Sequence, residues 1–173
     1  MFNRVFKKKN LPAFTLVEVI LYIALFSSVI TVFVGFIGMN AQLKGKNEAA
    51  FSVDSEALKI FQNISQTAKN ASSISFPAEG ANASSLSLAV DTPALTPTVY
   101  GLSSGRVQIT EGAGQPVFLS SDRVSVTNLT FRNMSNGTDN ELVRVELTLE
   151  YINSDNRKEK EYSQTYYTSI NLR

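Results

Sequence analysis

The chain begins with a short polar segment and then becomes apolar. Residues 1–12 are polar and basic, whereas from Leu16 to Met39 almost every residue is apolar and Glu18 carries the only charge. The 21 residues from Val19 to Met39 have no charge, and at about 1.5 Å per residue a helix of that length crosses a hydrocarbon core of about 30 Å. Secretory signal cores are shorter, at about 7–15 residues. The pattern predicts one membrane-spanning helix.

The helical pattern continues beyond the apolar stretch in an amphipathic form. Apolar residues recur at spacings of seven, three, three and four, namely at Phe51, Leu58, Phe61, Ile64 and Ala68. We expect this stripe to pack on a sheet. A single helix is therefore predicted from Phe14 to about Ser72, ended by Ser72-Ser73 and the following Pro77.

After Pro77 the period of the pattern changes from that of a helix to that of strands. Alternating residues around Leu88, Val124 and Leu129 indicate strands, and further strands are predicted at 98–102, 106–110, 117–119, 142–152 and 160–172. The alternation shifts by one residue between Val126 and Leu129, which predicts a β-bulge at Thr127-Asn128. The fold class is therefore α+β, with a long N-terminal helix packed on a mostly antiparallel β-sheet.

The charges place the two ends of the predicted membrane helix. The formal net charge is +1, but four basic residues (Arg4 and Lys7 to Lys9) precede Ala13, leaving 12 basic against 15 acidic residues elsewhere. Basic residues before a span place the N-terminus in the cytoplasm and the downstream domain outside. This balance gives no indication of nucleic-acid binding.

The start of the apolar stretch carries a specific motif. Lys7-Lys8-Lys9, the small residue Ala13 and then Phe14-Thr15-Leu16-Val17-Glu18 precede the apolar run. This string resembles the class III leader of type IV prepilins. The resemblance implies that a membrane prepilin peptidase cuts between Ala13 and Phe14 and methylates the new amine of Phe14. It also implies that Glu18 meets the terminal amine of a neighbouring subunit and so sets the register of a filament.

Two features depart from the pattern of that family. Ala13 precedes the cut where the family usually has Gly. The apolar helix has no Pro and contains Gly35 and Gly38 instead. These glycines weaken a helix by about 1 kcal/mol each relative to Ala, so they would permit local melting. Glycine is also simply frequent in membrane helices.

The resemblance divides the chain into a leader (1–13), a transmembrane and filament-core half-helix (14–39) and an extracytoplasmic globular domain (40–173). The layout looks like that of larger minor pilins and J-type minor pseudopilins, which share a long helix, a short strand ending in a Phe-Pro-like step and a β-rich part. The partners implied are other pilin or pseudopilin subunits, the prepilin peptidase/methylase, an inner-membrane assembly platform and membrane lipid. The filament would be a type IV pilus, a type II secretion pseudopilus or a competence filament.

The composition predicts no catalytic residue, cofactor or metal. The chain has no Cys and no His, which excludes thiol, zinc–thiolate and imidazole chemistry, and it contains no G-x-S-x-G motif. The carboxylate pairs Asp54/Glu56 and Glu146/Glu150 are interpreted as a solvated helix face and the outer face of a strand. Oxygens that could bind calcium occur without the spaced loop of a calcium site, at Asp122, Asp139, Asn140 and Glu141. Tyr166 and Tyr167 should face opposite sides of their strand.

Other readings of the N-terminal helix remain open. Glu18 lies near the cytoplasmic end, where its carboxylate can reach the interface of a plain signal anchor. The alternative function is then a non-polymerising, signal-anchored extracytoplasmic domain that binds a ligand or partner.

Overall fold

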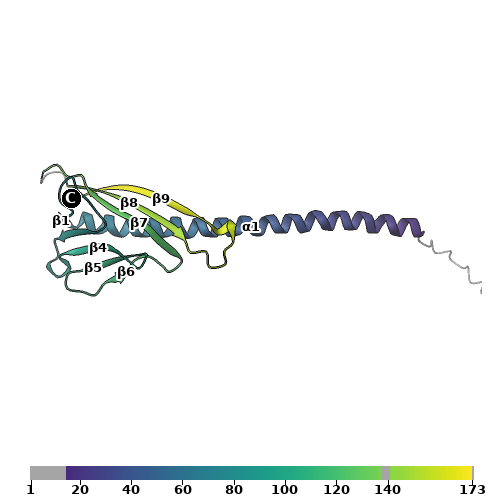
Figure 1. Cartoon of the computed structure of the whole chain (residues 1–173), viewed down its shortest axis with the longest axis horizontal. Coiled ribbons are helices and arrows are strands. Elements are labelled where there is room, and N and C mark those ends of the chain that lie inside the picture. The colour runs from purple at the N-terminus through teal and green to yellow at the C-terminus, as the bar shows by residue number, and fades with distance from the viewer. Residues whose placement is uncertain (1–14, 138–140, 173) are drawn as a thin grey trace, which may run out of the picture. The chain divides into compact units, whose positions relative to one another are not determined.

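The structure is a computed structural model that describes residues 15–137 and 141–172. Its longest element is a continuous α-helix of 54 residues, α1 (Leu16–Lys69) (Figure 1). The helix ends three residues before the predicted Ser72, because the chain turns at Asn70 and continues as a strand. The chain divides into two compact units, the first up to Gln42 and the second from Leu43 onward.

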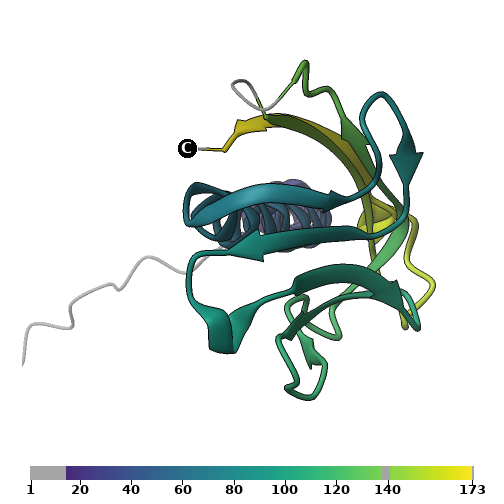
Figure 2. The ribbon, with the colours of Figure 1, turned by 90° about the vertical axis from the view of Figure 1, so that its left-hand side faces the viewer.

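The strands belong to the second unit and form two antiparallel sheets. The first sheet has the order β1-β3-β4-β5-β6 and the second has the order β2-β7-β8-β9. Their bounds are β1 (Ala71–Phe76), β2 (Asn82–Ala83), β3 (Leu86–Val90), β4 (Thr98–Ser103), β5 (Arg106–Glu111), β6 (Val117–Phe118), β7 (Val124–Asn133), β8 (Leu142–Tyr151) and β9 (Ser163–Asn171). Strands of both sheets curve around the second half of α1 (Figure 2). The predicted α+β fold is confirmed, and its strands are shared between two sheets.

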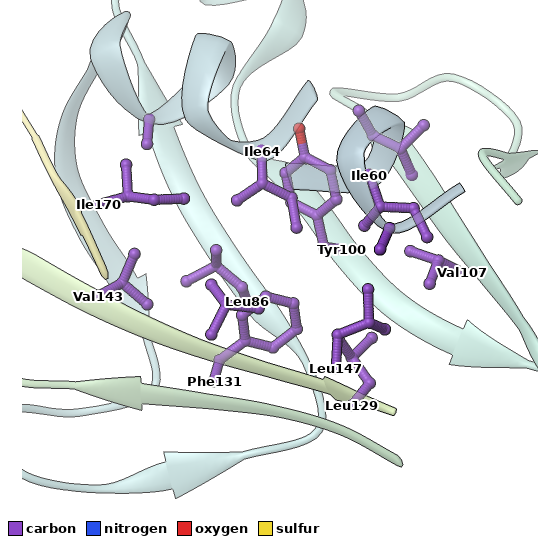
Figure 3. Close-up of a cluster of buried hydrophobic side chains, with 14 of the residues drawn as sticks. Ile60, Ile64, Leu86, Tyr100, Val107, Leu129, Phe131, Val143, Leu147 and Ile170 are labelled. Atoms are coloured by element: carbon purple, nitrogen blue, oxygen red, sulfur yellow. The ribbon is translucent and has the colours of Figure 1, made fainter. Parts of the chain in front are cut away.

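A stripe of small and branched side chains joins α1 to the sheets. Its members are at most 2% exposed and recur at spacings of four, four, three, four and four: Ala49, Val53, Ala57, Ile60, Ile64 and Ala68. Ile60 and Ile64 face Tyr100, Leu86 and Phe131 of the sheets, as Figure 3 shows.

The predicted stripe on α1 is therefore wrong at two positions. Phe51 is 73% exposed and Leu58 is 62% exposed, whereas Ile64 and Ala68 are buried as predicted and Phe61 is half-buried. At 3.6 residues per turn, Phe51 lies about 200° around the helix from the buried Val53. Sequence reasoning followed the largest apolar side chains, while the buried face uses alanines that a hydrophobicity pattern underweights.

The second sheet confirms the predicted irregularity. The pairing of β7 with β8 shifts register between Val126 and Asn128, so the bulge lies where the sequence predicts it. The extra residue allows Val126 and Leu129 to be buried on the same face although three positions separate them. The bulge thus keeps one continuous apolar face toward the helix.

The strands predicted at 98–102 and 106–110 are confirmed as β4 and β5, which form a hairpin. Ser103 pairs with Arg106, and the two residues between them, Ser104 and Gly105, have φ angles of 51° and 70°. A two-residue loop with both φ angles positive matches the twist of antiparallel strands. Gly105 adopts this conformation without the steric cost that a Cβ imposes.

Three short elements occur where no regular structure was predicted. Strand β2 and the 3₁₀ turns η1 (Pro93–Leu95) and η2 (Lys158–Lys160) lie within expected loops or strand ends. Strand β1 follows α1 directly and ends at Phe76, before Pro77. The short strand ending in a Phe-Pro step, which the family resemblance implied, is therefore present.

Candidate functional site

The first half of α1 presents apolar side chains on every side. From Leu16 to Met39 the large apolar residues are 45–77% exposed, and none of the most apolar window is buried within the structure. That window has a mean hydropathy of 2.5, which makes α1 the one helix among the described residues that is long and apolar enough to cross a membrane. A surface of this kind needs lipid or other helices around it.

Glu18 lies in the first turn of this apolar helix, next to a capping residue. The backbone N–H of Glu18 donates to Oγ1 of Thr15 at 3.2 Å, and Thr15 precedes the first helical residue. Thr15 is therefore the N-cap of α1, and it satisfies one of the backbone donors that a helix start leaves without a partner. A carboxylate in this first turn is also favoured by the positive end of the helix dipole.

The Glu18 side chain has one partner within its own helix. The hydroxyl of Tyr22 donates to Oε1 of Glu18 at 3.2 Å, across one helical turn. No described residue donates to Oε2. An ionised carboxylate has about four acceptor positions, so most of the hydrogen-bonding capacity of Glu18 stays available to a further donor.

Sequence reasoning identified Glu18 but missed its two local partners. The signal for the N-cap was present, because Thr15 and Glu18 have the Thr-x-x-Glu spacing of a capping box. The Tyr22 contact follows from the i, i+4 spacing on one helix face. The Tyr22 contact gives the Glu18 side chain a local role at the helix start, whereas the Thr15 contact uses only the backbone N–H of Glu18.

The other predicted residues of this segment differ in what the structure describes. Gly35 and Gly38 lie within the continuous helix, and a Cβ added at either would meet no heavy atom within 4 Å. Close packing against the described residues therefore requires neither glycine. The predicted cleavage site, Ala13 and Phe14, lies outside the described residues.

The carboxylate pair of the second half of α1 has a different role from the one predicted. Asp54 accepts a hydrogen bond from the Tyr166 hydroxyl of β9, and Oε2 of Glu56 accepts one from the backbone N–H of Ser121 at 3.1 Å. Burial and the neighbouring carboxylate of Asp54 raise the pKa of Tyr166 above its ordinary value. The interpretation of this pair as a merely solvated helix face is wrong, because both residues tie α1 to the β-rich part.

The other carboxylates and the tyrosine pair follow the predicted alternation. Glu146 accepts from the side-chain amide of Asn128 at 2.9 Å on the outer face of β8. Oε2 of Glu141 accepts from the backbone N–H of Ile74 at 2.7 Å, which links the two sheets. Tyr166 faces α1, whereas Tyr167 is 57% exposed, with the Arg144 guanidinium 5.3 Å from its ring centre.

The loop before β9 packs on α1 at a glycine. A Cβ at Gly45 would lie 3.4 Å from Cγ of Glu159, so the small residue allows the loop to approach the helix. Within the loop Arg157 pairs with Glu159 at 2.7 Å and Lys160 with Asp155 at 3.0 Å. Two of the three basic residues of this loop thus pair with acidic neighbours in the same loop.

The comparisons with known proteins add no relative. A scan against protein-family models finds no matching family, and searches of curated proteins and of solved structures find no match.

Proposed function

We propose that this chain is a pilin-like filament subunit, a minor pilin or pseudopilin, held in the cytoplasmic membrane by the first half of α1. In this proposal the peptidase cuts between Ala13 and Phe14, and the subunit then packs by its apolar helix against other subunits. The observation that carries the proposal is Glu18, a carboxylate in the first turn of a helix whose neighbouring side chains are apolar and exposed. In a plain anchor Glu18 would have only its local roles, the hydrogen bond from Tyr22 and the favourable end of the helix dipole.

The chemistry of the proposed cut supplies a partner for Glu18. Cleavage before Phe14 creates a cationic amine, and methylation keeps its charge. A carboxylate held among apolar helices is unfavourable when unpaired, and a cation from a neighbouring subunit relieves that cost. Oε2 of Glu18 has no donor among the described residues and is available for this contact. Glu18 would then set the register between subunits.

The two kinds of helix surface support the same proposal. The second half of α1 packs on the sheets through its buried stripe, and its Asp54 and Glu56 side chains accept hydrogen bonds from Tyr166 and Ser121. The first half presents a surface that is apolar almost throughout, suited to lipid or to other helices. A subunit that leaves the bilayer for a filament needs an apolar segment that can exchange lipid for helix neighbours.

Charge removal at Glu18 tests the proposal. Glu18→Gln keeps the size of the side chain and an oxygen that can accept from Tyr22, but it cannot pair with a cation as a carboxylate does. We expect Glu18→Gln and Glu18→Ala each to lower incorporation into sheared filaments about tenfold, because a charge pair across subunits is lost. The measurement is the ratio of subunit in the sheared fraction to subunit in the membrane fraction of native cells.

The control is Glu48→Ala, which removes an exposed carboxylate from the second half of the same helix. It should incorporate like the wild type. If Glu18→Gln were incorporated into filaments as well as the wild type is, the only role left for the Glu18 side chain would be its local hydrogen bond with Tyr22. The proposal would then fail in favour of a non-polymerising anchored domain.

A further inference from the structure

We propose that the free edge of β9 binds an extended segment of another polypeptide as an additional strand of the second sheet. The partner chemistry is a stretch of about eight or nine residues that alternates apolar and polar side chains. The proposal concerns only the second compact unit, from Leu43 onward, which includes the second half of α1. It does not depend on filament assembly.

The hydrogen-bond register shows which backbone groups of β9 are unused. The backbone N–H of Leu172 donates to the backbone carbonyl of Glu141 at 2.9 Å, and the N–H of Tyr151 donates to the carbonyl of Tyr162 at 2.9 Å. The even-numbered positions from 162 to 172 therefore form the hydrogen bonds to β8. In an antiparallel pair the alternate residues direct their N–H and C=O groups to the opposite side. These are Ser163, Thr165, Tyr167, Ser169 and Asn171.

Those outward groups have almost no partners within the described part of the chain. The sheet order ends at β9, and the one contact to this edge is from the Gln164 side-chain amide to the Thr165 carbonyl at 3.4 Å. An unpaired row of backbone donors and acceptors at this spacing is complementary to another extended backbone. Other ligands do not supply that alternation.

Strand β9 also lacks the features that protect sheet edges. Its sequence Ser-Gln-Thr-Tyr-Tyr-Thr-Ser-Ile-Asn contains no charge, no Pro and no Gly over nine residues. The other edge strands differ: β2 and β6 are two residues long, and β1 has two register shifts. Glu141 further occupies the backbone N–H of Ile74 in β1. Proteins usually shorten, bend or charge such edges, and β9 is the edge left open.

A groove beside this edge has room for side chains of an added strand. It has a volume of about 860 Å³, and its lining includes Leu58 and Phe61 of α1 together with Ile170 of β9. Leu58 is exposed in spite of its apolar side chain. Apolar side chains of an added strand that point toward α1 would cover Leu58 and Phe61. Those that point outward would lie beside Tyr167 and Ser169 and should be polar.

The dimensions of the helix and the strand agree. Phe51 and Leu58 lie on a face of α1 that continues to Lys69, and the residues on this face recur along the chain at spacings of seven, four, three and four. Together they cover 18 residues of helix, which span about 27 Å. The nine residues of β9 span about 30 Å at 3.3 Å per residue. One extended segment can therefore follow β9 and cover this helix face along its whole length. A second copy of β9 would bring its own helix and sheet, so a separate segment fits the groove better.

Selection from a random peptide library tests the proposal. The full chain, held in nanodiscs, is used to select 12-residue peptides displayed on phage. The selected peptides should alternate apolar and polar residues and lack Pro. On binding, the amides of Thr165, Tyr167 and Ser169 should become protected from hydrogen exchange in the wild-type chain.

Two variants at one position separate the backbone from the side chain. Ser169→Pro removes an outward N–H and no bond to β8, and Pro is tolerated at such edge positions. It should weaken peptide binding about tenfold or more, as expected for the loss of a backbone hydrogen bond and some contact area. Ser169→Ala keeps the N–H and should bind as the wild type does.

Several results would overturn the inference. They are failure to enrich any alternating peptide, binding that Ser169→Pro leaves unchanged, and exchange protection located away from β9. Self-association of the full chain through β9, detected by sedimentation in nanodiscs and abolished in Ser169→Pro, would assign the edge to a second copy instead.

Discussion

At the scale of single residues, Tyr100 is the polar contact at the centre of the helix–sheet interface. Its ring is fully buried, and its hydroxyl lies 2.8 Å from Oδ1 of Asn63 and 2.6 Å from Oγ1 of Thr67, both on α1. Burial raises the pKa of Tyr100 from its ordinary 10 to about 12. The protonated side chain is therefore part of the folded state.

This raised pKa has a predictable sign in stability. Above pH 10 the unfolded tyrosine loses its proton while the folded one keeps it. The stabilisation from Tyr100 is therefore complete below pH 10 and is lost as the pH rises through 12, by up to about 3 kcal/mol. Tyr100→Phe has no proton to lose.

We expect Tyr100→Phe to lower the free energy of unfolding by about 1 kcal/mol at pH 7, because the bonds to α1 are lost. The difference from the wild type should then shrink above pH 10 and reverse sign before pH 12, because the wild type loses more than about 1 kcal/mol over this range and the variant does not. Denaturant titration of the full chain in detergent, followed by circular dichroism, measures both effects. The exposed Tyr167→Phe is the control and should change the free energy of unfolding at pH 7 by less than about 0.5 kcal/mol. A constant difference for Tyr100→Phe at all pH values would contradict the assignment.

Residue-scale prediction from the sequence worked where a local pattern is specific. The bulge at Thr127-Asn128 follows from a change of alternation, and the turn at Gly105 follows from residue type. The partners of Asp54 and Glu56 could not be predicted. They lie 65 or more positions away along the chain, on elements that only the tertiary fold brings to the helix.

At the scale of elements, the face of α1 that packs on the sheets is the main correction to the sequence-based expectation. The existence of a two-part helix was clear from periodicity, but the position of its buried stripe was displaced. Alanines such as Ala49 and Ala57 are buried on this face, and their small size gives a weak signal in the sequence. Phe51 and Leu58 give a strong signal yet lie outside that interface.

Truncation on the two faces of α1 tests this correction. Ile60→Ala removes a fully buried side chain and should cost about 2–5 kcal/mol of unfolding free energy, because it leaves a cavity between the helix and the sheets. Leu58→Ala, two residues earlier, removes an exposed side chain and should change stability by less than about 0.5 kcal/mol. Denaturant midpoints of the two variants in the same detergent give the comparison. Equal losses would place Leu58 in the core and restore the predicted stripe.

At the scale of the whole chain, the fold class could be predicted and the association could not. The change from helical to strand periodicity at Pro77 is a local pattern of apolar and polar residues, so the α+β fold class could be predicted from the sequence. The division of the strands into two sheets depends on long-range pairing, such as that of β2 with β7, which carries no local signal. The apolar residues from Leu16 to Met39 are exposed in the described part of the chain, and their pattern does not specify whether lipid or another helix packs on them.

The central claim, that this chain is a processed pilin-like subunit, is tested most directly at its N-terminus. Mass spectrometry of the protein isolated from native membranes and filaments determines the first residue and any modification of its amine. The account predicts a chain that begins at Phe14 and carries an N-methyl group there. An intact Met1 terminus in both fractions would contradict it and would leave an anchored domain that is never processed.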